Sequence, residues 1–163
     1  MKLTDEVFGR MCCFYRGDPR RIQHFVKVHS FAAYIGHAEG LDAQTQETLE
    51  VAALVHDIGI KPAEKKYGSA AGKFQELEGP AEARRLLAGT EMRPEAVERV
   101  CLLVSRHHTY TDVLGIDHRI LLEADFLVNC FEDNVRPDAA RAFREQVFRT
   151  KTGTQLLTTM FSL

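Results

Sequence analysis

The sequence lacks any apolar run that approaches the roughly 20 residues a membrane-spanning helix needs. Its N-terminus, MKLTDEVFGRMCC, lacks the apolar core of a secretory signal peptide. The net charge is only −2, which gives no bulk reason to expect nucleic acid or an anionic membrane as a partner. From these absences we expect a cytoplasmic protein with no membrane partner and no strong signal for nucleic-acid binding.

Cysteine is scarce, and its spacing does not suit a metal centre. The four cysteines are Cys12, Cys13, Cys101 and Cys130, and no C-x-x-C pair occurs among them. Adjacent cysteines at 12 and 13 fit neither a zinc ribbon nor a disulfide framework. We therefore expect buried, reduced thiols.

Strand signals, internal repeats and Pro/Gly/Ser-rich linkers are also absent, and the apolar periodicity is helical nearly throughout. The pattern predicts an all-α globule of about six to eight helices. A length of 163 residues suits one domain, 1–163, with the motifs in a core of about 20–130 and C-terminal helices within 137–161. Residues 60–77 break the periodicity and are interpreted as a loop, with room for a short helix, that is long enough to act as a lid.

Helix ends are marked by a few residues. Asp18 and Pro19 are candidates for the N-cap and first position of one helix, and Gly40 for its C-terminal stop. The next helix contains VAALVHDIG and is expected to end near Gly59. His56 and Asp57 then lie close to a helix end, where adjacent side chains can reach one point.

Four polar residues interrupt separate apolar helical patterns: His24, His56, Asp57 and Asp125. Each alone has an ordinary explanation, as a hydrogen-bonded core histidine or a paired carboxylate. Together they offer two imidazoles and two carboxylates, and burying such groups without partners costs several kcal/mol. This mixed set suits an open or octahedral site for Mn²⁺, Fe, Co²⁺, Ni²⁺ or Mg²⁺ better than structural zinc.

The same residues resemble the HD superfamily of metal-dependent phosphohydrolases. Residues 24–32, HFVKVHSFA, are similar to the family's H-x-x-x-V-x-x-x-A, which selects His24 over His29 as first ligand. ALVHDIG is similar to the His-Asp doublet, and LLEADFLVN to the segment with the distal Asp. The resemblance covers about residues 20–130 and extends to a subgroup of small bacterial HD-domain hydrolases.

Two-metal members of that family carry further histidines after the doublet. RHHTY, with His107 and His108, resembles one of these elements. A histidine about 20 residues after the doublet is missing, and GKFQELEGPAEA stands there, with Glu76 and Glu78. By this resemblance Glu78 is the candidate second ligand or base. A one-metal site is favoured, and a second metal held by Glu78, His107 and His108 stays open.

The resemblance implies hydrolysis of a phosphate ester or phosphoanhydride of a small, nucleotide-like molecule. Asp57 would bind metal and orient water, and Lys61 would clamp phosphate or be a solvated lysine. His107 and His108 would be second-metal ligands, phosphate donors or a general acid. The expected catalytic residues are Asp57, Lys61, Glu78, His107 and His108, and the substrate contacts are Arg20, Lys61, Arg106 and Tyr110.

Other functions share these residues. A diiron oxygenase would need a filled second site, and a metal- or nucleotide-binding regulatory module would need no turnover. A structural helical protein with paired core polar groups would keep its thermal stability when chelator is added. The apolar tail GTQLLTTMFSL packs either on the core or on a second subunit, so a homodimer stays open.

Overall fold

The computed structural model describes residues 1–163 and contains nine helices and no strand. The predicted all-α fold is confirmed, with one helix more than the six to eight expected. The helices are α1 (Leu3–Phe14), α2 (Pro19–Ala38), α3 (Ala43–Val55), α4 (Ile60–Tyr67), α5 (Gly72–Leu87), α6 (Pro94–Val104), α7 (Ile116–Glu132), α8 (Pro137–Val147) and α9 (Lys151–Phe161).

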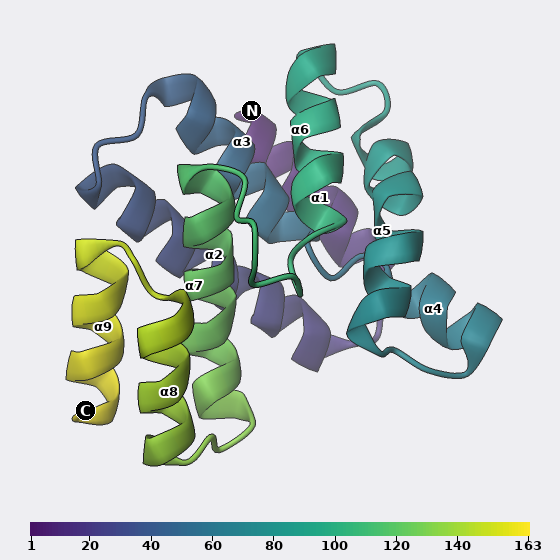
Figure 1. The fold of residues 1–163 in the computed structure, drawn as a ribbon. Helices are drawn as coiled ribbons and strands as arrows, with labels where there is room; N and C mark the ends of the chain where they lie inside the picture. The colour runs from purple at the N-terminus through teal and green to yellow at the C-terminus, as the bar shows by residue number, and fades with distance from the viewer.

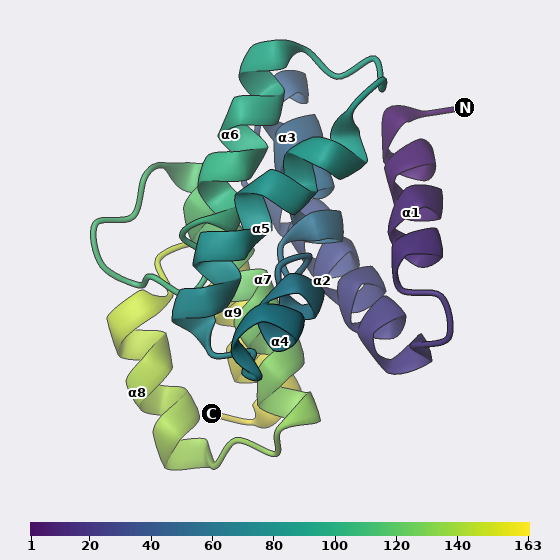
Figure 2. The ribbon, with the colours of Figure 1, turned by 90° about the vertical axis from the view of Figure 1, so that its right-hand side faces the viewer.

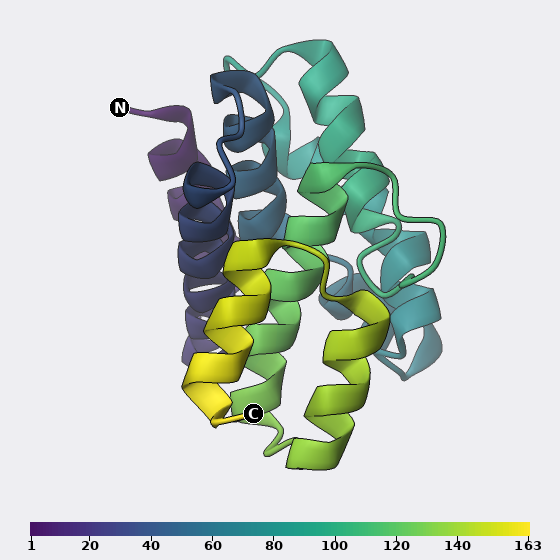
Figure 3. The ribbon, with the colours of Figure 1, turned by 60° about the vertical axis from the view of Figure 1, so that its left-hand side comes forward.

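Helices α2, α3 and α7 pack against one another at the centre of the molecule. A single cluster of 31 buried apolar residues draws on every helix except α4. Helices α8 and α9 lie on either side of α7 (Figure 3), whereas α1 covers α3 and α5 at the side of the molecule away from α8 (Figure 2). Helix α7 lies among the other helices (Figure 1), and most of its residues are buried, which explains why its apolar pattern makes Asp125 stand out.

The short helix for which residues 60–77 had room is present, but the expected long loop is wrong. Residues 60–67 form α4 and residue 72 already begins α5, so only Gly68 to Ala71 lie outside a helix. Gly68 ends α4 in the left-handed region, with φ of +65°, which a glycine adopts without a steric cost. Helices α4 and α5 pack against one another, so the long irregular segment on which the lid prediction rested is not present.

The predicted ends of α2 are confirmed, but the helix before the doublet ends earlier than expected. The Asp18 carboxylate accepts a hydrogen bond from the Arg21 amide, and Pro19 occupies the first turn of α2. Gly40 follows α2 with φ of +76°. Helix α3, however, ends at Val55, so His56 and Asp57 lie in the turn that leads to α4.

The C-terminal tail packs on the core of its own chain, with Leu157 fully buried. All four cysteines are free, and Cys101 and Cys130 are buried as expected. Cys13 is exposed, because it lies on the outer side of α1, and the expectation of a buried thiol is wrong there. None of the helices has the length and apolar character required to cross a membrane.

Candidate metal centre

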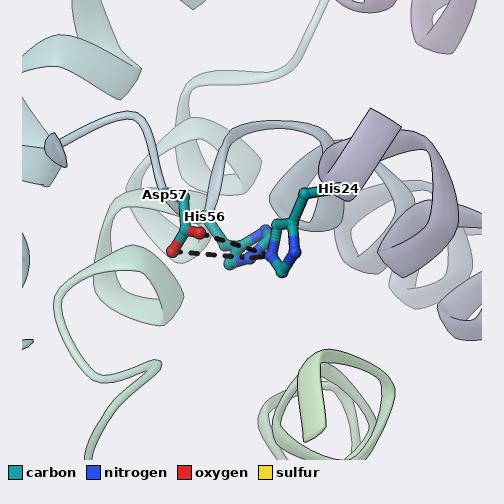
Figure 4. Close-up of side chains that lie close together, drawn as sticks. All are labelled: His24, His56 and Asp57. Atoms are coloured by element: carbon teal, nitrogen blue, oxygen red, sulfur yellow. Dashed lines mark hydrogen bonds and ion pairs between the residues drawn. The ribbon is translucent and has the colours of Figure 1, made fainter. Parts of the chain in front are cut away.

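Side chains from three places in the fold meet at one point: α2, the turn after α3, and α7. The Nε2 atom of His24 lies 3.3 Å from Nε2 of His56, 3.3 Å from Oδ2 of Asp57 and 3.2 Å from Oδ1 of Asp125. His56 Nε2 is also 3.4 Å from Oδ1 of Asp125. Figure 4 shows His24 facing the doublet from the opposite side. His56 is fully buried, and the other three side chains are at most 14% exposed.

The hydrogen bonds of both imidazoles leave their Nε2 atoms free to bind an ion. Nδ1 of His56 donates to the Ala53 carbonyl at 2.8 Å, and Nδ1 of His24 faces a carboxylate oxygen of Glu132 at 2.5 Å. In the neutral imidazoles each Nε2 therefore carries a lone pair, and the two lone pairs face each other beside two carboxylates. Oδ1 of Asp125 is buried and has no hydrogen-bond donor. This arrangement fits a divalent cation, with Glu132 orienting one ligand.

The electrostatics of the cluster also favour a positive charge at this point. Burial by itself lowers the pKa of His24, but Asp125, Asp57 and Glu132 outweigh it and raise that pKa to about 9. Burial acts to raise the pKa of Asp57 and of Asp125, yet the adjacent imidazoles hold both well below the usual range. The two carboxylates stay ionised, and their charge is balanced by a proton on His24 or by a cation that takes the place of that proton.

A second cluster adjoins the first through Asp57. Oδ1 of Asp57 lies 3.0 Å from Nε2 of His107, and the ligand atoms of Asp57, His107 and His108 lie within 4.8 Å of one another. The side-chain oxygen of Gln75 is 3.2 Å from Nε2 of His107 and 3.1 Å from Nε2 of His108. The Gln75 amide nitrogen donates to the Ala70 carbonyl at 2.7 Å, which points the amide oxygen at the histidines.

A family model described as "HD domain" matches residues 21–129. The chain belongs to the HD-domain family. The chain is similar to the crystal structure of a "predicted HD superfamily hydrolase" from an uncultured Thermotogales bacterium. The similarity covers 97% of this chain and 84% of that chain. The two chains are 26% identical, with a TM-score of 0.69. No functionally curated protein matches the sequence. The family and this neighbour support a metal-dependent hydrolase, and either cluster could hold a divalent metal ion.

In this HD domain the two remaining candidate catalytic side chains lie away from the clusters. The carboxylate of Glu78 accepts hydrogen bonds from Tyr67 at 2.7 Å and Lys66 at 3.0 Å, because α5 begins at Gly72 and turns Glu78 toward α4. The Lys61 ammonium donates to the Phe14 carbonyl at 2.5 Å and does not reach the metal ligands in this arrangement.

The expected substrate contacts lie in different places. Arg20 lines a polar pocket together with His24 and Asp57. The Arg106 guanidinium donates to carbonyls in the loop that follows α6, at 3.2 and 3.4 Å, and thereby braces that loop. Tyr110 is 41% exposed, and burial of the rest of its ring, together with Asp125, raises its pKa to about 12.

Among the first-ligand candidates the structure brings His24, rather than His29, to the doublet. His29 pairs with Glu50 at 3.1 Å on another face of α2. That separation agrees with the helical wheel, on which the two histidines are about 140° apart at ~100° per residue.

Two residues that contact the clusters were not found by the sequence analysis. Glu132 lies seven residues after Asp125 on α7, and helical spacing from Asp125 is the signal that finds it. Gln75 carries no charge and no imidazole, so a search for charged or imidazole ligands after the doublet does not find it. Its spacing, 19 residues after His56, is the remaining signal.

Proposed function

We propose that this protein is a metal-dependent phosphohydrolase that acts on a phosphate ester or phosphoanhydride of a small, nucleotide-like molecule. The observation that carries the proposal is the buried set of two imidazole nitrogens and two ionised carboxylates, one with an oxygen that lacks any donor. Such a set holds a cation and leaves further coordination positions open. The polar pocket beside it gives a substrate access.

The four ligands would be His24, His56, Asp57 and Asp125. An ion bound to them would lower the pKa of a coordinated water and neutralise phosphoryl charge. Asp57, whose two oxygens face different histidines, would accept a hydrogen bond from the attacking water and orient it. Arg20, whose side chain has no hydrogen bond or ion pair within the chain, would contact a phosphate oxygen.

His107 and His108 would act on the second side of Asp57. Burial and the neighbouring His107 lower the pKa of His108 to about 4, so His108 is neutral at pH 7 and can hydrogen-bond or bind an ion. Asp57 raises the pKa of His107 despite burial, which suits a proton donor to the leaving oxygen. The Gln75 amide in place of an imidazole favours one tightly held metal, and it weighs against a diiron oxygenase.

Metal analysis of the purified protein, followed by a phosphatase panel with Mn²⁺, Co²⁺, Mg²⁺ and Ni²⁺, tests this function. We expect about one ion per chain and phosphate release from at least one phosphoester. His56→Ala and Asp125→Asn should lose both, whereas His37→Ala, an exposed histidine on α2, should keep them. Absence of ion binding in the wild type refutes the metal centre, and absence of phosphate release with every ion refutes the phosphohydrolase.

A further inference from the structure

A pocket of about 390 Å³ opens directly onto the candidate metal centre. His24 and Asp57 form its inner wall, and the first turn of α2 and the end of α7 form its sides. The volume lies within the range of roughly 300–1,000 Å³ that is usual for small-molecule sites. No hydrophobic side chain lines it. A ligand that reaches the metal ligands through this pocket therefore contacts polar groups only.

Three side chains in the pocket wall are free to bind a ligand. Arg20, Asn129 and Asp133 make no side-chain hydrogen bond or ion pair within the chain, and Asp133 is exposed. The other polar groups are engaged. Glu132 holds His24 and Lys27, and Arg21 is paired with Glu64 at 2.5 Å. The free groups thus comprise one guanidinium, one amide and one carboxylate.

Asn129 is well placed between the metal centre and the solvent. It follows Asp125 by four residues on α7, so both lie on the same face of the helix. Asp133 lies four residues further along, where α7 ends. An amide and a carboxylate arranged in this order can hydrogen-bond successive hydroxyl groups of one molecule, because an amide both donates and accepts and a carboxylate accepts.

The charges limit what kind of molecule fits. The pocket wall carries four carboxylates and two guanidinium groups, and one of the latter, on Arg21, is already paired with Glu64. A second phosphate placed in the pocket would therefore face more negative than positive groups. A nucleobase or aromatic ring gains its affinity from stacking on apolar or aromatic surfaces, and the pocket has none. Hydroxyl groups satisfy both conditions, because they are uncharged and donate to carboxylates.

We propose that this pocket binds the alcohol part of a phosphomonoester and that this alcohol is polyhydroxylated, as in a sugar phosphate. Asn129 and Asp133 are the specificity-determining residues, with Arg20 on the phosphate side. The inference rests on the phosphohydrolase function proposed above and narrows it to one substrate class, with a nucleotide bound through its sugar rather than its base.

Substrate pairs and two variants test the pocket. Ribose 5-phosphate supplies the polyol, and p-nitrophenyl phosphate supplies the same phosphate on an apolar ring. In Asn129→Leu and in Asp133→Asn, we expect the ratio of kcat/KM for ribose 5-phosphate to that for p-nitrophenyl phosphate to fall at least tenfold. Asp138→Asn, an exposed carboxylate on α8, is the matched control and should keep the wild-type ratio.

A binding measurement separates the two proposals. Calorimetry with metal-loaded protein compares the 5-phosphonate analogue of ribose 5-phosphate with methylphosphonate, and neither compound is hydrolysed. We expect the wild type to bind the ribose analogue at least tenfold more tightly and each variant to lose most of that preference. Equal affinities in the wild type, or an unchanged preference in both variants, overturn the pocket assignment. A wild type that prefers the ribose analogue but hydrolyses no phosphoester overturns the enzymatic function and leaves the pocket's ligand class standing.

Discussion

Replacing Gln75 with histidine should convert a weak second cation site into a strong one. The Gln75 oxygen already lies within 3.2 Å of both neighbouring imidazoles, and Oδ1 of Asp57 lies 3.0 Å from the same Nε2 atom of His107. Gln75→His therefore adds a third imidazole where the wild type offers a neutral amide oxygen. Imidazole is the better ligand for Fe, Co and Ni. We expect the variant to bind two ions per chain and the wild type to bind one tightly.

The expected size of the effect follows from mass action. A second site that is tenfold tighter gains about 1.4 kcal/mol in binding free energy. At a free-ion concentration 100 times the variant's second Kd, that site stabilises the variant by about 2.7 kcal/mol and the wild type by about 1.4 kcal/mol. For a chain of this size, a difference of about 1.3 kcal/mol corresponds to a Tm difference of roughly 3–5 °C.

Calorimetric titration with Co²⁺ and a thermal melt at the same ion concentration measure both quantities. Gln155→His, which adds a histidine on the exposed side of α9, is the control and should keep the wild type's second-site affinity. If Gln75→His still binds one ion with an unchanged ion-dependent Tm, Gln75 does not limit the second site. The adjacent histidines then have another role, such as hydrogen bonding to phosphate.

Three further predictions concern groups around the site. Glu132→Gln should weaken metal binding about 10- to 100-fold in calorimetry, because Glu132 orients His24. Burial lowers the pKa of His118 below its ordinary 6.5, so its contribution to stability is complete above about pH 6.5 and falls as the pH decreases further. In urea unfolding with chelator present, His118→Gln should lose part of the stability decrease between pH 7 and 5. Gly59→Ala should cost at least about 1–3 kcal/mol, because a Cβ there would lie 2.5 Å from the Gln75 carbonyl oxygen.

For each of these three predictions, one result would contradict the reasoning. An unchanged metal Kd in Glu132→Gln would mean that His24 is held by other contacts. A pH profile of His118→Gln parallel to that of the wild type would mean that His118 takes up its proton equally in both states. Gly9→Ala, where a Cβ meets no atom within 4 Å on α1, should stabilise by roughly 0.5–1 kcal/mol, and it is the control for Gly59→Ala.

The metal ligands could be found in the sequence because each breaks a strong local pattern. His24 and Asp125 lie on helices where most neighbours at helical spacing are apolar, and the doublet directly follows α3, whose last residues, Val51–Val55, are all apolar and buried. A buried charge without an apparent partner is visible in a single sequence, since the cost of its burial does not depend on knowing the fold. Four such residues from separate parts of the chain therefore predicted one shared centre, where they are partners of one another.

The segment after the doublet could not be predicted in the same way. Helices α4 and α5 meet where Gly59 lies against Gly79, and a Cβ on Gly59 would lie only 2.8 Å from the Gly79 nitrogen. Gly79 interrupts the helical pattern inside α5, although the missing side chains of the two glycines are what allows this close approach. Tertiary packing therefore overrides propensity here, as it often does for short polar helices. The approach also sets which residue of α5 faces the cluster, and it selects Gln75 instead of Glu78.

Asp57 connects the cluster that could be predicted from the sequence with the cluster that could not. Its Oδ2 faces His24, whereas its Oδ1 faces His56 and His107, so one carboxylate belongs to both clusters. The first cluster is set by α2, α3 and α7, whose helical character is recognisable in the sequence, and the second by the contact of α5 with the turn after α3. A carboxylate in a helix interior would point to one side only. Because α3 ends at Val55, Asp57 lies in a turn between the two sets of helices, so we expect a change in the packing of α5 to act first on the second cluster.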